Sequence, residues 1–143
     1  MTLARALYQD DEEQRRLAMA AWIEAHNQQY DIFINFIKCV KRFDIDTLQR
    51  EFVGIGDIVN LPDMDNKATA LHYAAGSGAR KIIQWLANQP EIDHLITDRF
   101  RRLPSVMAYE VGKDAALGLY LAKKEHKQAV EQGMDIREML VHP

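Results

Sequence analysis

The segment TALHYAAGSG, residues 69–78, decides how the rest of the chain is interpreted. It joins a threonine and a histidine, three residues apart, to a run of alanine, glycine and serine. The histidine suggests a catalytic base or a metal ligand, and the two glycines suggest a phosphate-binding loop. A structural interpretation competes with both, because small residues let helices approach closely and glycine permits a sharp turn.

The catalytic and ligand-binding interpretations lack the residues that they need. The sequence GSG at 76–78 has no following Lys and Ser/Thr and no preceding strand, so it does not match a phosphate loop. His72 has no cysteine or acid at metal-ligand spacing. Cys39 lies on an apolar helix face, where a small buried cysteine is common. We therefore expect no catalytic residue, no metal and no cofactor; an enzyme would require a polar cleft with perturbed acids or a histidine pair.

The composition is that of one folded domain, residues 1–143. Hydrophobic residues make up 48% and charged residues 27%, and the formal net charge of −3 gives no electrostatic reason to expect nucleic acid. The single cysteine excludes an intrachain disulfide and fits a reducing compartment. The start of the chain lacks a signal-peptide pattern, and no apolar stretch reaches membrane-spanning length. We expect a cytoplasmic protein without a membrane partner, with unconventional secretion left open.

Apolar residues recur at helical spacing through most of the chain. Asp31 is the expected N-cap of the helix in DIFINFIKCV (31–40), and Asp44 that of the next one. The turn-rich stretch VGIGDIVNLPDMDN (53–66) is a connector and not a strand. The first expected helical segment covers residues 2–26, in which a short helix at 3–8 is allowed to precede the main one. Helix pairs then follow at 32–42 with 45–52, 70–75 with 80–88, and 103–110 with 113–131. Asp135 is the expected cap of a final short helix at 136–140.

The helix pairs repeat at an interval of about 34 residues. At this offset Ala74 lies over Ala108 and Gly78 over Gly112. Aligned backward by about 35 residues, Ala74 meets Cys39, which preserves size and apolarity only. Repeats of this length stack helix pairs, and each pair buries its face against the next.

The segment TALHYAAGSGARKIIQWLAN (69–88) resembles an ankyrin repeat. The family pattern T-P-L-H-x-A-A-x-x-G matches here, and two aliphatic residues and a leucine follow in the second helix. The resemblance is clear over about 60–92 and extends, in degenerate units, over 31–122. The sequence departs from the pattern in lacking the glycine before Thr69, in a loop that is one residue longer, and in having Arg101 or Arg102 at the glycine position of the third unit. The matched positions are Thr69, Ala70, Leu71, His72, Ala74, Ala75, Gly78, Ile82, Ile83 and Leu86.

The resemblance implies an all-α fold, a short ankyrin-like stack with helical caps at residues 1–30 and 123–143. It also implies that Thr69 and His72 tie the turn to neighbouring backbone, so that the opening segment is structural. The function it implies is non-enzymatic binding of a protein partner through hairpin tips and first-helix faces. The positions that correspond to this surface are Met64, Asp65, Asn66, Lys67, Tyr73, Ser77, Arg99, Phe100, Arg101 and Met107.

The basic cluster Arg99-Phe100-Arg101-Arg102 has two interpretations. A solvated turn is one, and a contact patch is the other, because an aromatic residue flanked by arginines has the composition of a binding hot spot. Stacking on single-stranded nucleic acid needs a longer basic surface. The alternative function is that of an inhibitor or immunity protein for a cognate toxin or enzyme, or of an effector that acts on another cell's proteins. The sequence leaves the oligomeric state open.

Overall fold

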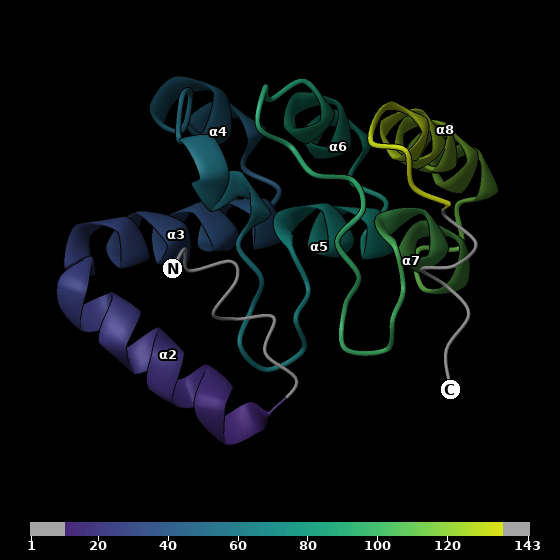
Figure 1. Cartoon of the computed structure of the whole chain (residues 1–143). Coiled ribbons are helices and arrows are strands. Elements are labelled where there is room, and N and C mark those ends of the chain that lie inside the picture. Colours follow the sequence, from purple (N-terminus) through teal and green to yellow (C-terminus); the bar gives the residue numbers. More distant parts are fainter. Residues whose placement is uncertain (1–10, 136–143) are drawn as a thin grey trace.

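A computed structural model describes residues 11–135, which form seven α-helices and one short 3-10 helix, η1 (Figure 1). Between residues 11 and 135 there is no strand, so the expected all-α class is confirmed for this part of the chain. The connector at 53–66 contains η1, which the sequence did not predict. The elements are α2 (Glu12–Ala25), α3 (Asn27–Lys41), α4 (Ile45–Glu51), η1 (Gly56–Asn60), α5 (Ala70–Gly76), α6 (Arg80–Ala87), α7 (Pro104–Glu110) and α8 (Ala115–Glu131).

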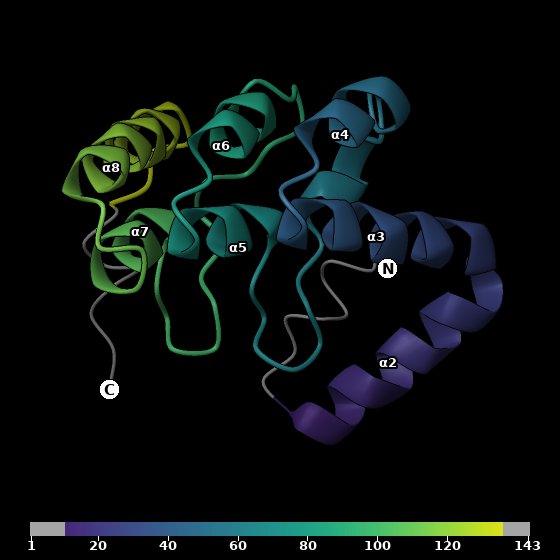
Figure 2. The ribbon, with the colours of Figure 1, turned by 180° about the vertical axis from the view of Figure 1, so that it is seen from behind.

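The helices that follow α2 lie in two layers (Figures 1 and 2). One layer holds α3, α5 and α7 side by side, and the other holds α4, α6 and α8. The helix α5 is central, since it packs against α3, α6 and α7. Two long loops, within residues 61–69 and 96–103, extend past the first layer on the side away from the second. The helix α2 contacts α3 and slants away from it at one end of the row.

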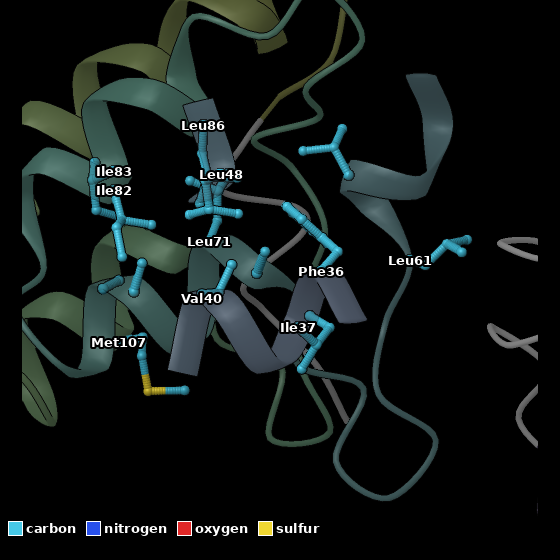
Figure 3. Close-up of a cluster of buried hydrophobic side chains, with 14 of the residues drawn as sticks. Phe36, Ile37, Val40, Leu48, Leu61, Leu71, Ile82, Ile83, Leu86 and Met107 are labelled. Atoms are coloured by element: carbon cyan, nitrogen blue, oxygen red, sulfur yellow. The ribbon is translucent and has the colours of Figure 1, made fainter. Parts of the chain in front are cut away.

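The core runs between the layers and is continuous along the row of helices (Figure 3). Each helix contributes apolar residues at the three- and four-residue spacing that the sequence showed. Phe36 of α3, which is fully buried, packs its ring against Phe52 and Trp85 at 5.7 and 6.4 Å between centroids. Alanines occupy the contacts between first-layer helices. The residues below 2% exposure include Phe36, Val40, Leu48, Leu71, Ala74, Ala75, Ile83, Leu86, Ala108 and Leu121.

Acidic side chains begin several of the helices, as their positions in the sequence predict. Asp44 caps α4 by accepting from the Thr47 N–H at 3.1 Å, and Asp11 caps α2 by accepting from the Glu13 N–H at 2.9 Å. The expected start of α8 at 113 is two residues early, because Asp114 is its N-cap and accepts from the Leu117 N–H.

The expected cap at Asp31 is wrong. The N-cap residue lies five residues earlier, at His26, and α3 begins at Asn27. The His26 ring stacks on Trp22 at 4.7 Å between centroids, and its Nδ1 lies 3.1 Å from the Trp22 carbonyl oxygen. The chain therefore turns sharply between α2 and α3 at this stacked pair, and residues 27–30 are free to continue the helix. The expected short helices at 3–8 and 136–140 lie outside the described residues.

The turns inside the three helix pairs share one backbone conformation. Phe43, Gly78 and Lys113 follow one another at intervals of 35 residues, and their φ angles are 59°, 67° and 52°. Each precedes the N-cap residue of the second helix of its pair. A left-handed residue is therefore needed at this point, although only the central pair supplies glycine.

Gly112, which the sequence alignment placed over Gly78, is needed for a different reason. It precedes the left-handed residue Lys113, and its Cα faces neighbouring backbone. A Cβ added at Gly112 would lie 2.5 Å from the Ala75 carbonyl oxygen and 2.9 Å from the Ala108 carbonyl oxygen. Gly112 therefore permits the end of α7 to approach the end of α5 closely.

We predict that Gly112→Ala lowers the free energy of unfolding by about 1–3 kcal/mol, the usual cost of overpacking. Backbone must move to admit the methyl group. Gly54→Ala is the control. A Cβ at Gly54 would have nothing within 4 Å, so this substitution measures only the strain of a left-handed backbone, φ 77°, without a close approach. Chemical denaturation should show the larger loss for Gly112→Ala, and equal losses would contradict the close-approach argument.

Glu125 of α8 is a buried carboxylate, 1% exposed, at the contact between α7 and α8. Both of its oxygens face Ser105 in the first turn of α7. Oε2 accepts from the Ser105 N–H at 2.9 Å, and Oε1 accepts from the Ser105 hydroxyl at 2.5 Å. These bonds satisfy a helix-start N–H that has no partner within α7. Burial outweighs them and raises the pKa of Glu125 to about 7.

We predict that the free energy of unfolding of Glu125→Gln increases relative to that of the wild type as pH rises from about 5 to 8. The folded-state pKa of Glu125 is raised above its unfolded value of 4.5. Its contribution to stability is therefore full below pH 4.5 and is lost as pH rises through 7. The full effect is on the order of 3 kcal/mol. Glu131→Gln, at an exposed position of the same helix, is the control, and a pH-independent difference for Glu125→Gln would contradict the prediction.

Candidate interaction surface

The first long loop ends in a tip with a fixed shape, residues 63–68, which we call the first loop tip. The Asp63 N–H donates to the Ala68 carbonyl at 2.8 Å, and the Lys67 N–H donates to the Asp63 carbonyl at 2.9 Å. The Asp63 carboxylate accepts from the Asp65 N–H at 2.9 Å. Lys67 completes the turn with a left-handed backbone, φ 58°.

The second loop tip, residues 98–102, is built around one buried carboxylate. Asp98 is 4% exposed and accepts three hydrogen bonds of 2.9 Å, from the Phe100 N–H, the Arg102 N–H and the Arg102 Nε–H. Its own N–H donates to the Arg102 carbonyl at 3.0 Å. The acid therefore lies inside the tip, and the side chains of Arg99, Phe100 and Arg101 are left exposed.

The two loop tips are joined to each other and to α5. The Arg99 N–H donates to the Asn66 carbonyl at 2.8 Å, which links the second tip to the first. The Nε2–H of His72 in α5 donates to the Arg102 carbonyl at 2.8 Å, which links the second tip to the helix layer. Hydrogen bonds therefore tie both tips to each other and to the scaffold.

His72 can make its contacts only as a neutral imidazole. The Arg102 carbonyl is an acceptor, so Nε2 must carry the hydrogen. The Thr69 N–H is a donor, 3.1 Å from Nδ1, so Nδ1 must be unprotonated. The Thr69 hydroxyl completes a capping box at the start of α5. Burial lowers the pKa of His72, which favours this neutral form.

We predict that the wild type loses stability relative to His72→Asn as pH falls below about 6.5. The folded-state pKa of His72 is lowered, so its contribution is present above the unfolded value and is lost as pH falls toward the folded one. Asparagine keeps an acceptor for the Thr69 N–H but does not titrate. Thermal melting of both proteins between about pH 8 and 5 tests this, and parallel pH profiles would contradict it.

Tyr73 of α5 ties the first loop tip to the helix layer. Its hydroxyl donates to Asp63 Oδ2 at 2.8 Å and accepts from Asn66 Nδ2 at 3.2 Å. Burial and the bond to Asp63 raise the pKa of Tyr73 to about 12. The Lys41 ammonium of α3 lies 4.5 Å from the centre of the Tyr73 ring. Tyr73 and Asn66 are two of the expected contact residues. Their polar groups instead form hydrogen bonds within the chain, and both residues are half-buried.

The other expected contact residues differ in exposure. Phe100 is 68% exposed, and Arg99, Arg101, Asp65 and Ser77 are exposed as well. Met64 and Lys67 are half-buried, and Met64 packs against the core. The exposed members of the expected set therefore concentrate on the second loop tip.

The expected exposed position at Met107 is wrong. Met107 of α7 is only 9% exposed and belongs to the core cluster (Figure 3). Gly76 leaves room for it, since a Cβ there would lie 3.3 Å from Met107 Cγ. Tyr109 and Val111 are the large exposed hydrophobic residues at the C-terminal end of α7, at 66% and 51% exposure. Val111 lies beside Gly76, where the same Cβ would be 3.6 Å from its Cγ1.

Sequence reasoning missed Asp98 and Lys41 as parts of this region. The repeat offers a signal for Asp98, which lies 35 residues after Asp63 and closes its loop in the same way. No signal in the sequence points to Lys41, because its contact with Tyr73 joins α3 to α5 across the first loop.

Three side chains of types that enzymes use, His72, Glu125 and Cys39, lie in the interior or are half-buried. His72 and Glu125 are buried in internal hydrogen bonds. Burial raises the pKa of the half-buried Cys39 thiol, which favours the protonated, less nucleophilic form. A groove of about 350 Å³ between Phe43 and Ile82 has no carboxylate or imidazole in its lining, whereas an open groove of about 640 Å³ on α8 is lined by His126 and Glu131. Residues 76–78 form the turn between α5 and α6. Among residues 11–135 no three His, Cys, Asp or Glu side chains are grouped to hold a metal ion.

Comparison of the chain with protein-family models, with curated proteins and with solved structures finds no match. Within the described part of the chain, none of the helices has both the length and the apolar character that crossing a membrane requires.

Proposed function

We propose that the chain is a short ankyrin-like stack, residues 31–122 with helical caps, that binds a protein partner without catalysing a reaction. Two features support the stack. The left-handed turn residues recur at 35-residue intervals, and Thr69 and His72 form a capping box that reaches the next loop. The interaction surface comprises the two loop tips and exposed positions of the first helices, such as Ser77 at the end of α5.

The observation that carries the binding function is the exposure of Phe100 on a rigid support. An aromatic side chain that is 68% exposed contributes nothing to the core, yet the loop beneath it is held by the three bonds of Asp98. The Arg102 guanidinium lies 5.1 Å from the centre of the Phe100 ring and holds it further. A preorganised aromatic side chain loses little conformational entropy on binding, and aromatic and arginine residues dominate binding hot spots.

We predict that Phe100→Ala with Arg101→Glu abolishes capture of the partner while folding is retained. Tagged wild-type and variant chains would be incubated with native lysate in the presence of nuclease, and captured proteins identified by mass spectrometry. The thermal melting temperature should not change appreciably, because neither side chain is part of the core.

The control is Leu119→Ala with Lys123→Glu, which likewise truncates one exposed apolar side chain and reverses one basic charge, here on α8. This control should capture the same protein as the wild type. Retention of that protein by the Phe100→Ala, Arg101→Glu variant, or its loss from the α8 control, would remove the second loop tip from the binding site.

A further inference from the structure

We propose that the second loop tip binds an acidic segment of the partner protein, with carboxylates over Arg99 and Arg101 and an apolar side chain against Phe100. This inference rests on the proposed binding function and adds the chemistry of the partner. It follows from how the charges of the tip are distributed between its inside and its surface.

The fold neutralises one arginine of the cluster and leaves two available. Arg102 pairs with Asp98, with Nε 2.9 Å from Oδ2. The guanidinium groups of Arg99 and Arg101 take part in no ion pair or side-chain hydrogen bond among residues 11–135, and both side chains are exposed. Their positive charge is therefore free to bind a carboxylate from outside, to which arginine donates two parallel hydrogen bonds.

The backbone sets the two arginines in fixed positions. The Arg99 N–H is bound to the Asn66 carbonyl, and the Arg101 N–H donates to the Asp98 carbonyl at 2.9 Å. Arg101 has a left-handed backbone, φ 62°, that the surrounding bonds of the tip hold in place. Phe100 lies between the two in sequence, with the Arg102 guanidinium near its ring. The tip thus presents charge, aromatic surface and charge on one short rigid segment.

An acidic protein segment fits this tip better than nucleic acid does. The positive charge is local, because the chain as a whole carries a formal charge of −3. Asp65, on the adjoining first loop tip, is exposed and would repel a phosphate backbone that continued across both tips. A protein segment can place its carboxylates over the arginines and a neutral or basic residue beside Asp65. Charge complementarity of this kind selects partners and speeds their association.

The test is selection of short random peptides, displayed on phage, on the immobilised full-length chain. Selected peptides should be enriched in aspartate and glutamate with an accompanying apolar residue. Their affinity should fall by about tenfold or more in the Arg99→Glu, Arg101→Glu variant and should weaken with added salt. Asp65→Asn should bind the same peptides more tightly. Lys123→Glu with Lys127→Glu, an equal charge reversal at exposed positions of α8, should bind them as the wild type does.

Several outcomes would overturn the inference. Selected peptides that are neutral or basic, acidic peptides that bind the Arg99→Glu, Arg101→Glu variant equally well, or an absence of any enriched peptide would each do so. Arginine-dependent binding of a single-stranded oligonucleotide, or arginine-dependent self-association in sedimentation, would assign the tip to a different occupant. If protein capture still depends on Phe100 while the selected peptides are neutral, the acidic partner is wrong and the proposed function stands. If capture does not depend on the tip, the proposed function itself falls.

Discussion

The imidazole of His72 joins the start of α5 to the loop that follows α6, and both of its nitrogens are used. Nδ1 accepts from the Thr69 N–H, while the Nε2–H donates to the Arg102 carbonyl, thirty residues further along the chain. The same carbonyl accepts from the Asp98 N–H, so the bond fixes the second loop tip at its base. The exposed side chains of the tip depend on this buried, neutral group for their positions. A loose loop would have to be ordered when the partner binds, at a cost in conformational entropy.

Close helix packing provides the frame to which His72 is attached. Alanines at 74, 75 and 108 are fully buried or nearly so, and Gly112 brings the end of α7 against the Ala75 carbonyl. Larger side chains at these positions would separate α5 from α7 and move the second loop away from His72. The bond between His72 and the second loop thus depends on alanine and glycine residues that have no polar side chain.

Two buried titratable groups make opposite contributions to the dependence of stability on pH. His72 is neutral in its bonds and becomes less compatible with the fold as pH falls. Glu125 is held by Ser105 but buried, so it becomes less compatible as pH rises. Each group supplies a partner for backbone at the start of a helix, α5 in one case and α7 in the other. The starts of α5 and α7 are therefore stabilised by groups that are costly to ionise, unlike those of α2, α4 and α8, which aspartates cap.

The sequence by itself determined the all-helical class, most helix positions, the turn at Gly78 and the exposed cluster at Arg99, Phe100 and Arg101. These features are local: apolar spacing, a glycine and a charged loop act within a few residues. It misplaced the start of α3 because the stacking of His26 on Trp22 moves the turn upstream of the apolar stripe.

Only the tertiary structure decided which members of the expected surface are free. Met107 is buried because Gly76, on a different helix, leaves space for it, and Tyr73 is engaged because the first loop folds back to bring Asp63 against its hydroxyl. The Glu125–Ser105 contact joins two helices that a turn separates, and the pKa of Glu125 is raised because burial there outweighs the bonds to Ser105. Exposure and ionisation depend on neighbours that are distant in sequence, and helical periodicity carries no information about them.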